Sequence, residues 1–285
     1  MIKKYLKFII IAGAVALVAG GGVFLAKHLV AQKNNKIETR EPISISQSSV
    51  NTEDVAIIAH RGLSAAAPEN TAHSIRAAVK AGINLVEFDI SESRDGTPVL
   101  MHDDTVNRMT DGTGKVKNFT YYELLKMKFD NGANLEKYGD VRITSAEEAL
   151  EICDSSMVVP VLDIKDISEE CEKRLFEMIE DKALPTIPII ISFDGERLVK
   201  LKKQYPDYKY MYLVSQITDE SIKFCNDNGL GIDFNANNNK NSDEDIKKLA
   251  ESDMQVACWT VDDIEQFEKL VNLGVKLITS NVLVP

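Results

Sequence analysis

LVEFDISESRDGTPVLMHD, residues 85–103, contains two β-rich runs, Leu85–Ile90 and Pro98–His102, joined by only seven residues. A crossover between parallel strands needs a dozen or more residues, usually with a helix. The Asp95-Gly96 pair in the joining segment is instead typical of a tight hairpin. The run that ends at His102 is therefore predicted to pair antiparallel with the run before it.

Nine such runs lie between Val55 and the C-terminus, and amphipathic stretches separate most of them. The other seven are Val55–Ala59, Met157–Ile164, Ile187–Phe193, Tyr208–Val214, Gly231–Asn235, Gln255–Val261 and Lys276–Thr279. The amphipathic stretches include Thr71–Ala81, Glu169–Asp181, Gly195–Gln204, Asp243–Glu251 and Ile264–Leu273. This alternation indicates βα units and a parallel sheet. With the hairpin strand set apart, eight parallel runs remain, which predicts an α/β fold of the (β/α)8 TIM-type barrel class over residues 54–285.

An open, doubly wound sheet is the alternative fold. It is less favoured because no glycine-rich phosphate loop follows the first run. Residues 103–142 fit no βα unit, although they contain a short helical piece, Tyr121–Met127. We expect these residues to form an insertion after the second barrel strand, near the mouth of the barrel, where insertions often shape substrate access.

The N-terminus differs in composition from the predicted barrel. Residues 8–26 carry no charge, are mostly apolar and follow three lysines. A helix of this length roughly spans the hydrocarbon core of a membrane. We expect one uncleaved transmembrane helix within residues 1–30, a flexible polar linker over 31–53, and a catalytic domain outside the cytoplasm. A cleaved signal peptide, followed by secretion of the domain, is the alternative.

Charge and cysteine content narrow the function classes. The formal net charge is −11 and the first 40 residues carry +6, so the remainder carries −17. A body this acidic is poorly suited to nucleic acid, and no such partner is expected. A single phosphate group can still bind, because nearby charges and any metal determine such a site. The four cysteines form no metal-type spacing and are expected in the core; a disulfide stays open if the domain lies outside the cell.

Acidic side chains at strand ends suggest a metal site. Glu87 and Asp89 are two residues apart on one strand, so both point to the same face. Confined in a barrel interior, two carboxylates are costly unless a cation neutralises them or a proton is retained. With Asp163, on the next parallel run, they form an all-oxygen set that suits Mg²⁺ or Ca²⁺. A solvated strand edge explains Glu87 and Asp89 equally well.

Basic side chains occupy neighbouring strand ends. In a (β/α)8 barrel the C-terminal strand ends open onto one face, where catalysis occurs. His60 and His102 are candidate proton carriers there, because imidazole titrates near neutral pH. Arg61 offers planar donors suited to two phosphate oxygens, and Lys165 is a candidate second phosphate contact. Structural hydrogen bonds and ion pairs are the alternative roles for all four.

The segment Pro68-Glu69-Asn70-Thr71 opens the first predicted helix. Asn70 or Thr71 is expected to cap that helix. Glu69 is also placed to hold Arg61 or a substrate hydroxyl.

Two long segments resemble a known family. AHRGLSAAAPENT (residues 59–71) and AGINLVEFDISESRDGTPVLMHDDTVNRMTDGTG (residues 81–114) resemble the glycerophosphodiester phosphodiesterase family. The family pattern has His-Arg-Gly, a Pro-Glu-Asn-Thr helix start, Glu-x-Asp on the next strand, and His-Asp after a hairpin. Weaker matches are VRITSAEEAL, VLDIK, IIISFD and CWTVDD, so that the resemblance runs from Val55 to the C-terminus.

The resemblance implies a (β/α)8 barrel and hydrolysis of glycerophosphodiesters to glycerol 3-phosphate and an alcohol. It implies a bound Ca²⁺ or Mg²⁺ held by Glu87, Asp89 and Asp163. His60 and His102 would be the general acid and base, and Arg61 and Lys165 would contact phosphate. Four residues in the matching motifs are expected to support the site: Glu69, Asn70, Phe193 and Trp259.

Two departures from the family pattern bear on activity. The third metal ligand is normally glutamate, and Asp163 is one methylene shorter. The closing motif is often Thr-Asp, whereas this chain has Thr279-Ser280-Asn281. We expect activity with an altered metal or substrate preference. Two alternatives stay open: a non-catalytic, membrane-held binder of lipid head groups or polyol-phosphate polymers, and a phospholipase D-like phosphodiesterase that acts on intact lipids.

Overall fold

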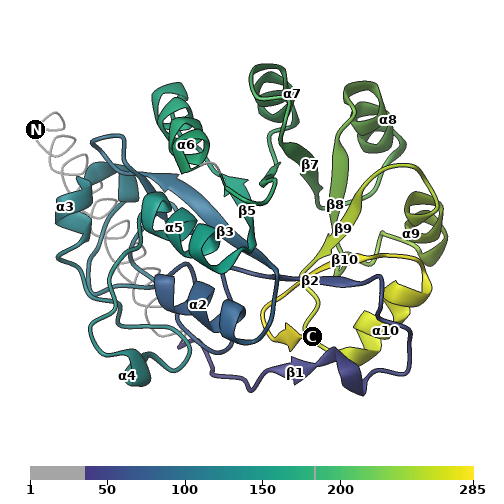
Figure 1. Ribbon diagram of the computed structural model, residues 1–285, viewed down its shortest axis with the longest axis horizontal. Coiled ribbons are helices and arrows are strands. Elements are labelled where there is room, and N and C mark those ends of the chain that lie inside the picture. The colour runs from purple at the N-terminus through teal and green to yellow at the C-terminus, as the bar shows by residue number, and fades with distance from the viewer. Residues whose placement is uncertain (1–35, 183) are drawn as a thin grey trace, which may run out of the picture.

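Eight parallel strands form a closed barrel in the computed structural model, which describes residues 36–182 and 184–285 (Figure 1). Closure occurs because β2 pairs with both β10 and β3. The barrel strands are β2 (Ala56–Ala59), β3 (Leu85–Glu92), β5 (Val159–Ile164), β6 (Ile189–Ser192), β7 (Lys209–Val214), β8 (Gly231–Asn235), β9 (Val256–Trp259) and β10 (Leu277–Ser280). The predicted (β/α)8 barrel is confirmed, and the closed ring rules out the open sheet.

The hairpin after β3 is also confirmed. β4 (Pro98–Leu100) pairs antiparallel with the end of β3, from Ile90 to Glu92. This pairing extends β3 beyond its predicted end, so Glu87 and Asp89 lie in mid-strand. β4 is shorter than predicted, because its pairing with β3 ends at Leu100 and His102 follows in a turn.

Amphipathic helices cover the outside of the barrel (Figure 1). They are α2 (Ala72–Lys80), α5 (Ala146–Ser156), α6 (Glu169–Lys182), α7 (Gly195–Gln204), α8 (Asp219–Asn228), α9 (Asp243–Ala250) and α10 (Ile264–Asn272). Each packs an apolar face on the strands, and together they bury the largest hydrophobic cluster. Cys153, Cys171, Cys225 and Cys258 are buried and free, as their core interpretation predicts.

The insertion has a hydrophobic cluster of its own beside β4. Its buried members are Val99, Met101, Val106, Met109, Val116, Leu124, Phe129, Val141 and Ile143. It contains a 3-10 turn, η2 (Val116–Asn118), and two short helices, α3 (Tyr121–Leu124) and α4 (Leu135–Tyr138). α3 ends before the predicted Met127, whose sulfur lies against Gly112. The insertion is therefore a packed unit.

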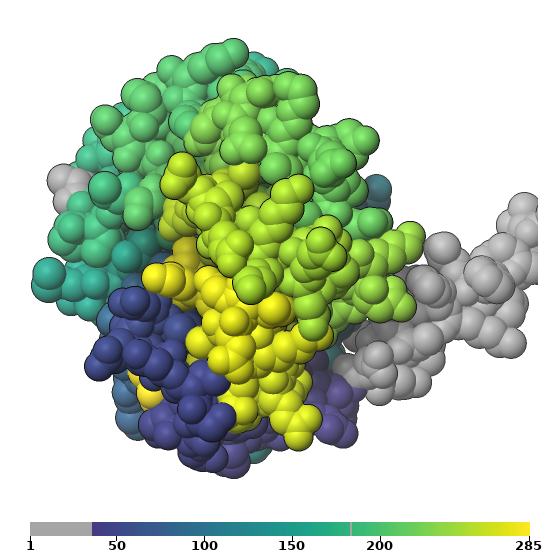
Figure 2. Space-filling view, turned by 90° about the vertical axis from the view of Figure 1, so that its right-hand side faces the viewer, coloured from purple at the N-terminus to yellow at the C-terminus, as the bar shows by residue number. Residues whose placement is uncertain are grey.

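Residues 36–53 pack against the barrel, so the predicted flexible linker is wrong for this part. β1 (Ile43–Ser44) pairs in parallel with β11 (Leu283–Val284), and η1 (Ile45–Gln47) follows it. Ile45 is buried, and Arg40 forms a 2.9 Å ion pair with Asp262. Figure 2 shows these N-terminal residues beside the C-terminal ones. The polar composition of the segment obscured the apolar contacts of its isoleucines.

The predicted membrane anchor, residues 1–30, lies outside the described residues. Within residues 36–182 and 184–285, no helix is long and apolar enough to cross a membrane.

Candidate active site

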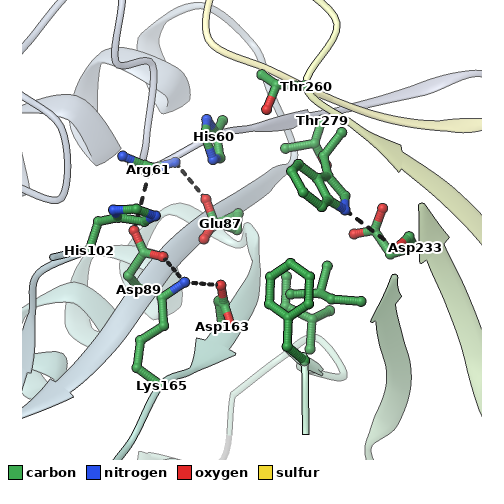
Figure 3. Close-up of a pocket in the computed structure, with 14 residues that line it drawn as sticks. His60, Arg61, Glu87, Asp89, His102, Asp163, Lys165, Asp233, Thr260 and Thr279 are labelled. Atoms are coloured by element: carbon green, nitrogen blue, oxygen red, sulfur yellow. Dashed lines mark hydrogen bonds and ion pairs between the residues drawn. The ribbon is translucent and has the colours of Figure 1, made fainter. Parts of the chain in front are cut away.

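A pocket opens among the C-terminal ends of the barrel strands (Figure 3). Its lining residues are His60, Arg61, Glu87, Asp89, His102, Asp163, Lys165, Ile191, Phe193, Leu213, Asp233, Trp259, Thr260 and Thr279. The structure thus brings together all seven residues predicted as proton carriers, phosphate contacts or metal ligands. Phe193 and Trp259 complete one wall, where their rings meet edge to face at 5.7 Å between centroids.

Three carboxylates meet inside the barrel. Glu87 and Asp89 on β3 and Asp163 on β5 are buried and offer oxygen atoms within 4.8 Å of one another. Asp89 stands opposite Asp163 in the register of the two strands. The interior position of Glu87 and Asp89 excludes the solvated-edge interpretation.

Two cations and one amide hold these carboxylates. Lys165 Nζ lies 2.7 Å from Asp89 Oδ1 and also donates to Asp163 Oδ2. Arg61 Nε lies 3.4 Å from Asp89 Oδ2, and the Arg61 backbone N–H donates to Glu87 Oε2 at 2.7 Å. Asn70 donates to Asp89 Oδ2 at 2.6 Å and accepts from the Asp89 backbone N–H. Thr71, not Asn70, caps α2, which leaves the Asn70 side chain free for this contact.

The cluster still fits an added cation. Two positive side chains face three carboxylates, and the buried Asp163 Oδ1 has no hydrogen-bond partner among the described residues. Burial, reinforced by Asp89 and Asp163, holds the pKa of Glu87 well above its usual value. Burial also raises the pKa of Asp163 to about 6, with Lys165 opposing and Asp89 adding to the shift. All the donor atoms are hard oxygens, which Mg²⁺ and Ca²⁺ prefer.

His60 is held in one orientation by a chain of polar contacts. Its Nδ1 lies 2.7 Å from Asn281 Oδ1, which also accepts from Ser64. Asn281 Nδ2 donates to Asp262 Oδ2 at 2.8 Å, so the amide must present its oxygen to the ring. His60 Nδ1 is therefore the donor, and Nε2 is unprotonated in the neutral ring. Burial, together with the charge of Arg61, lowers the pKa of His60 to about 4.

His102 has a different partner. Its Nδ1 lies 2.8 Å from Asp103 Oδ1. Arg108 Nε donates to Asp103 Oδ2 at 2.7 Å, and the same guanidinium binds Glu69, which also accepts from Arg61 at 2.9 Å. Burial alone would raise the pKa of Asp103, but the hydrogen bonds from His102 and Arg108 hold it well below its usual range. The network connects the insertion to Arg61 through Glu69.

Sequence reasoning missed several residues of this site, and four of them carry charged or amide side chains. Asn281 and Asp262 support His60, Arg108 joins Asp103 to Glu69, and Asp233 lines the wall beside Trp259. Asp233 carried a usable signal, because an acidic residue at the centre of the β-rich run GIDFN has to face one side of a buried strand. Asn281, Asp262 and Arg108 act through hydrogen bonds that no local sequence pattern predicts.

The family is decided by direct comparison. The model of the glycerophosphoryl diester phosphodiesterase family matches residues 60–283. This chain belongs to that family. The match begins directly after β2 and spans the other seven barrel strands, the insertion and every pocket residue described above.

Individual members of the family are similar over different lengths. A glycerophosphodiester phosphodiesterase of Caldanaerobacter subterraneus subsp. tengcongensis is 30% identical over 77% of this chain and 90% of its own length. Human glycerophosphodiester phosphodiesterase 1 is 36% identical over 52% of this chain and 46% of its own length, so the chain spans about half of that relative. A solved Oleispira antarctica phosphodiesterase, in complex with the product sn-glycerol-3-phosphate, is 27% identical with a TM-score of 0.74, over 84% of this chain and 96% of that one.

Proposed function

We propose that this protein hydrolyses glycerophosphodiesters to glycerol 3-phosphate and an alcohol. The observation that carries the proposal is the meeting of two histidines, two cations and three carboxylates at one barrel mouth, in a chain of this family. The product named in the Oleispira antarctica complex is the one this reaction releases. Each group predicted for this chemistry lines the same pocket, which supports the proposal.

A divalent cation, Mg²⁺ or Ca²⁺, would be held by Glu87, Asp89 and Asp163. When bound, it would supply a Lewis acid that neutralises charge on the phosphodiester and lowers the pKa of an attacking hydroxyl. The side chains of Arg61 and Lys165 add positive charge on the same side of the pocket. They orient the phosphoryl oxygens and stabilise the charge that grows on them in the transition state.

The two histidines divide the proton transfers. His60 Nε2 has a free lone pair and the ring stays neutral at physiological pH, so His60 acts as the general base. His102, whose Nδ1 is held by the Asp103 carboxylate, acts as the general acid toward the leaving alcohol. If water attacks, the reaction gives glycerol 3-phosphate and the alcohol directly. If the neighbouring glycerol hydroxyl attacks, the alcohol leaves and a cyclic glycerol phosphate forms, which water then opens to glycerol 3-phosphate.

A product assay tests the proposal. Purified protein would be incubated with a panel of water-soluble glycerophosphodiesters and with vesicles of intact phospholipid, with Mg²⁺, Ca²⁺ or a chelator. We expect release of glycerol 3-phosphate from the soluble substrates, and loss of that release with the chelator. Metal-dependent binding without turnover would refute hydrolysis, and turnover of vesicles alone would favour a phospholipase D-like activity.

We further propose that residues 1–30 anchor the protein in a membrane, with the barrel outside the cytoplasm. The uncharged run over residues 8–26 supports this assignment.

A further inference from the structure

Asp233 is a buried acid that the proposed chemistry does not use. It lies at the centre of β8, between Leu213 on β7 and Ala257 on β9. Its side chain lines the pocket and is only 2% exposed. Oδ1 has no hydrogen-bond partner among the described residues, and no cation there forms an ion pair with the carboxyl. The charge that acts on it is the like charge of Asp163.

Such a group is costly to the fold. A buried polar atom without a partner loses the hydrogen bonds that it would make with water. An apolar side chain of similar size would fill the same place at less cost, as Ile191 and Leu213 do on the adjoining wall. A ligand in the pocket that forms a hydrogen bond with Asp233 would offset this cost.

The surroundings of Asp233 define the chemistry of that ligand group. The phosphate-binding charges, Arg61 and Lys165, stand on the other side of the pocket (Figure 3). Apolar and aromatic side chains line the pocket together with Asp233, as do the hydroxyl-bearing Thr260 and Thr279. A carboxyl group here can exchange a hydrogen bond with a neutral hydroxyl group. Burial and Asp163 hold the pKa of Asp233 well above its usual value, which favours a neutral partner over a cation.

We propose that Asp233 binds a hydroxyl group of the substrate and selects polyol phosphodiesters; this rests on the proposed function. The hydroxyl belongs either to the glycerol moiety or to a polyol head group. Trp259 supports the contact, because its Nε1 donates to the Asp233 backbone carbonyl at 3.3 Å and keeps the indole beside the carboxyl.

The experiment compares Asp233→Leu and Asp233→Asn with the wild type. The substrates are glycerophosphoethanol, glycerophosphocholine and glycerophosphoinositol, which differ in head-group hydroxyls and charge. We expect Asp233→Leu to lower kcat/KM on the order of 10- to 100-fold. We expect Asp233→Asn, which still accepts a hydrogen bond, to recover most of it. Leu213→Val, on the same wall, is the packing control and should change kcat/KM of all three substrates by one small factor.

The pattern of loss identifies the hydroxyl. Equal loss on all three substrates assigns it to the glycerol moiety, and loss confined to glycerophosphoinositol assigns it to the head group. The midpoint of thermal unfolding should stay the same or rise in Asp233→Leu, because the unpaired carboxyl is gone.

Three results would overturn the proposal. The first is no loss of kcat/KM in Asp233→Leu. The second is a loss confined to glycerophosphocholine, which would mean that Asp233 contacts the ammonium group. The third is an equal loss in both variants with a lower unfolding midpoint, which would mean a structural role. If the wild type releases no glycerol 3-phosphate from any substrate, the proposed function itself is refuted and the Asp233 proposal with it.

Discussion

His60 and His102 reach one pocket from different elements and with different partners, an amide for the first and a carboxylate for the second. Replacing either with alanine should lower kcat by about 10²- to 10⁴-fold, because each would transfer a proton in the transition state. Release of glycerol 3-phosphate measures the effect. His73→Ala is the matched control, since the His73 ring packs tilted against Tyr138, with centroids 4.8 Å apart, and is not among the residues that line the pocket. Near-normal rates in both variants, with intact circular dichroism, would exclude this mechanism.

The carboxylate cluster should make the pH profile depend on metal concentration. Asp163, whose pKa burial raises to about 6, must lose its proton before it can bind a cation, so metal affinity falls as pH drops through 6. His60 protonates only near pH 4, because burial and Arg61 lower its pKa. We expect the acid limb of kcat/KM to lie near pH 6 at low Mg²⁺ and to move toward pH 4 at saturating Mg²⁺. An acid limb that stays fixed across a Mg²⁺ titration would contradict this assignment.

Asn281 is expected to be a positioning residue for His60. Asn281→Leu removes the acceptor that fixes the His60 tautomer, so kcat should fall about 10-fold with little change in KM. Steady-state kinetics on a soluble glycerophosphodiester measures both constants. Asn228→Leu at the end of α8 is the control, since its side-chain amide donates to the Phe224 carbonyl and forms no other hydrogen bond within residues 36–182 and 184–285. A larger change in KM than in kcat would mean that Asn281 contacts substrate instead.

At the scale of elements, the barrel was predictable because the βα alternation and the Asp95-Gly96 turn are signals that short stretches of sequence carry. The same local signals placed Glu87, Asp89 and Asp163 at one mouth, since strand direction alone brings those positions together. β1 and β11 were not predictable, because two-residue strands carry no periodicity. The Asn281 contact to His60 joins residues 221 positions apart, and no local pattern in the sequence indicates it.

The docked N-terminal segment makes a prediction about truncation. A chain that starts at residue 54 loses the burial of Ile45, about 2 kcal/mol, and the half-exposed Arg40–Asp262 ion pair, which adds less. Its midpoint of thermal unfolding should fall by about 4–8 °C, while a chain that starts at residue 36 should match the full-length protein. Differential scanning calorimetry of the three proteins measures these midpoints. Equal midpoints for all three would show that β1 and its neighbours contribute nothing.

For the whole molecule, the strongly apolar N-terminus predicts attachment to a membrane, and the acidic remainder predicts a domain that lies in water. Full-length protein should sediment with membranes and resist extraction by high salt, because an apolar helix and not charge would hold it there. Residues 36–285 should stay in the supernatant. Fractionation of cells that express each form measures this. Full-length protein in the soluble cytoplasmic fraction would contradict the anchor.

Exchanging the insertion between relatives, as a way to change substrate preference, would also change the hydrogen-bond partners of His102. Asp103 and Arg108 belong to the insertion, whereas His102 and Glu69 belong to the barrel. A chimera that exchanges residues 103–142 as one block would replace Asp103 and Arg108 with the donor's residues, while His102 stays that of the recipient. The graft boundary should therefore lie after Arg108, so that a donor loop changes the entrance and leaves the hydrogen-bond partners of His102 and Glu69 intact.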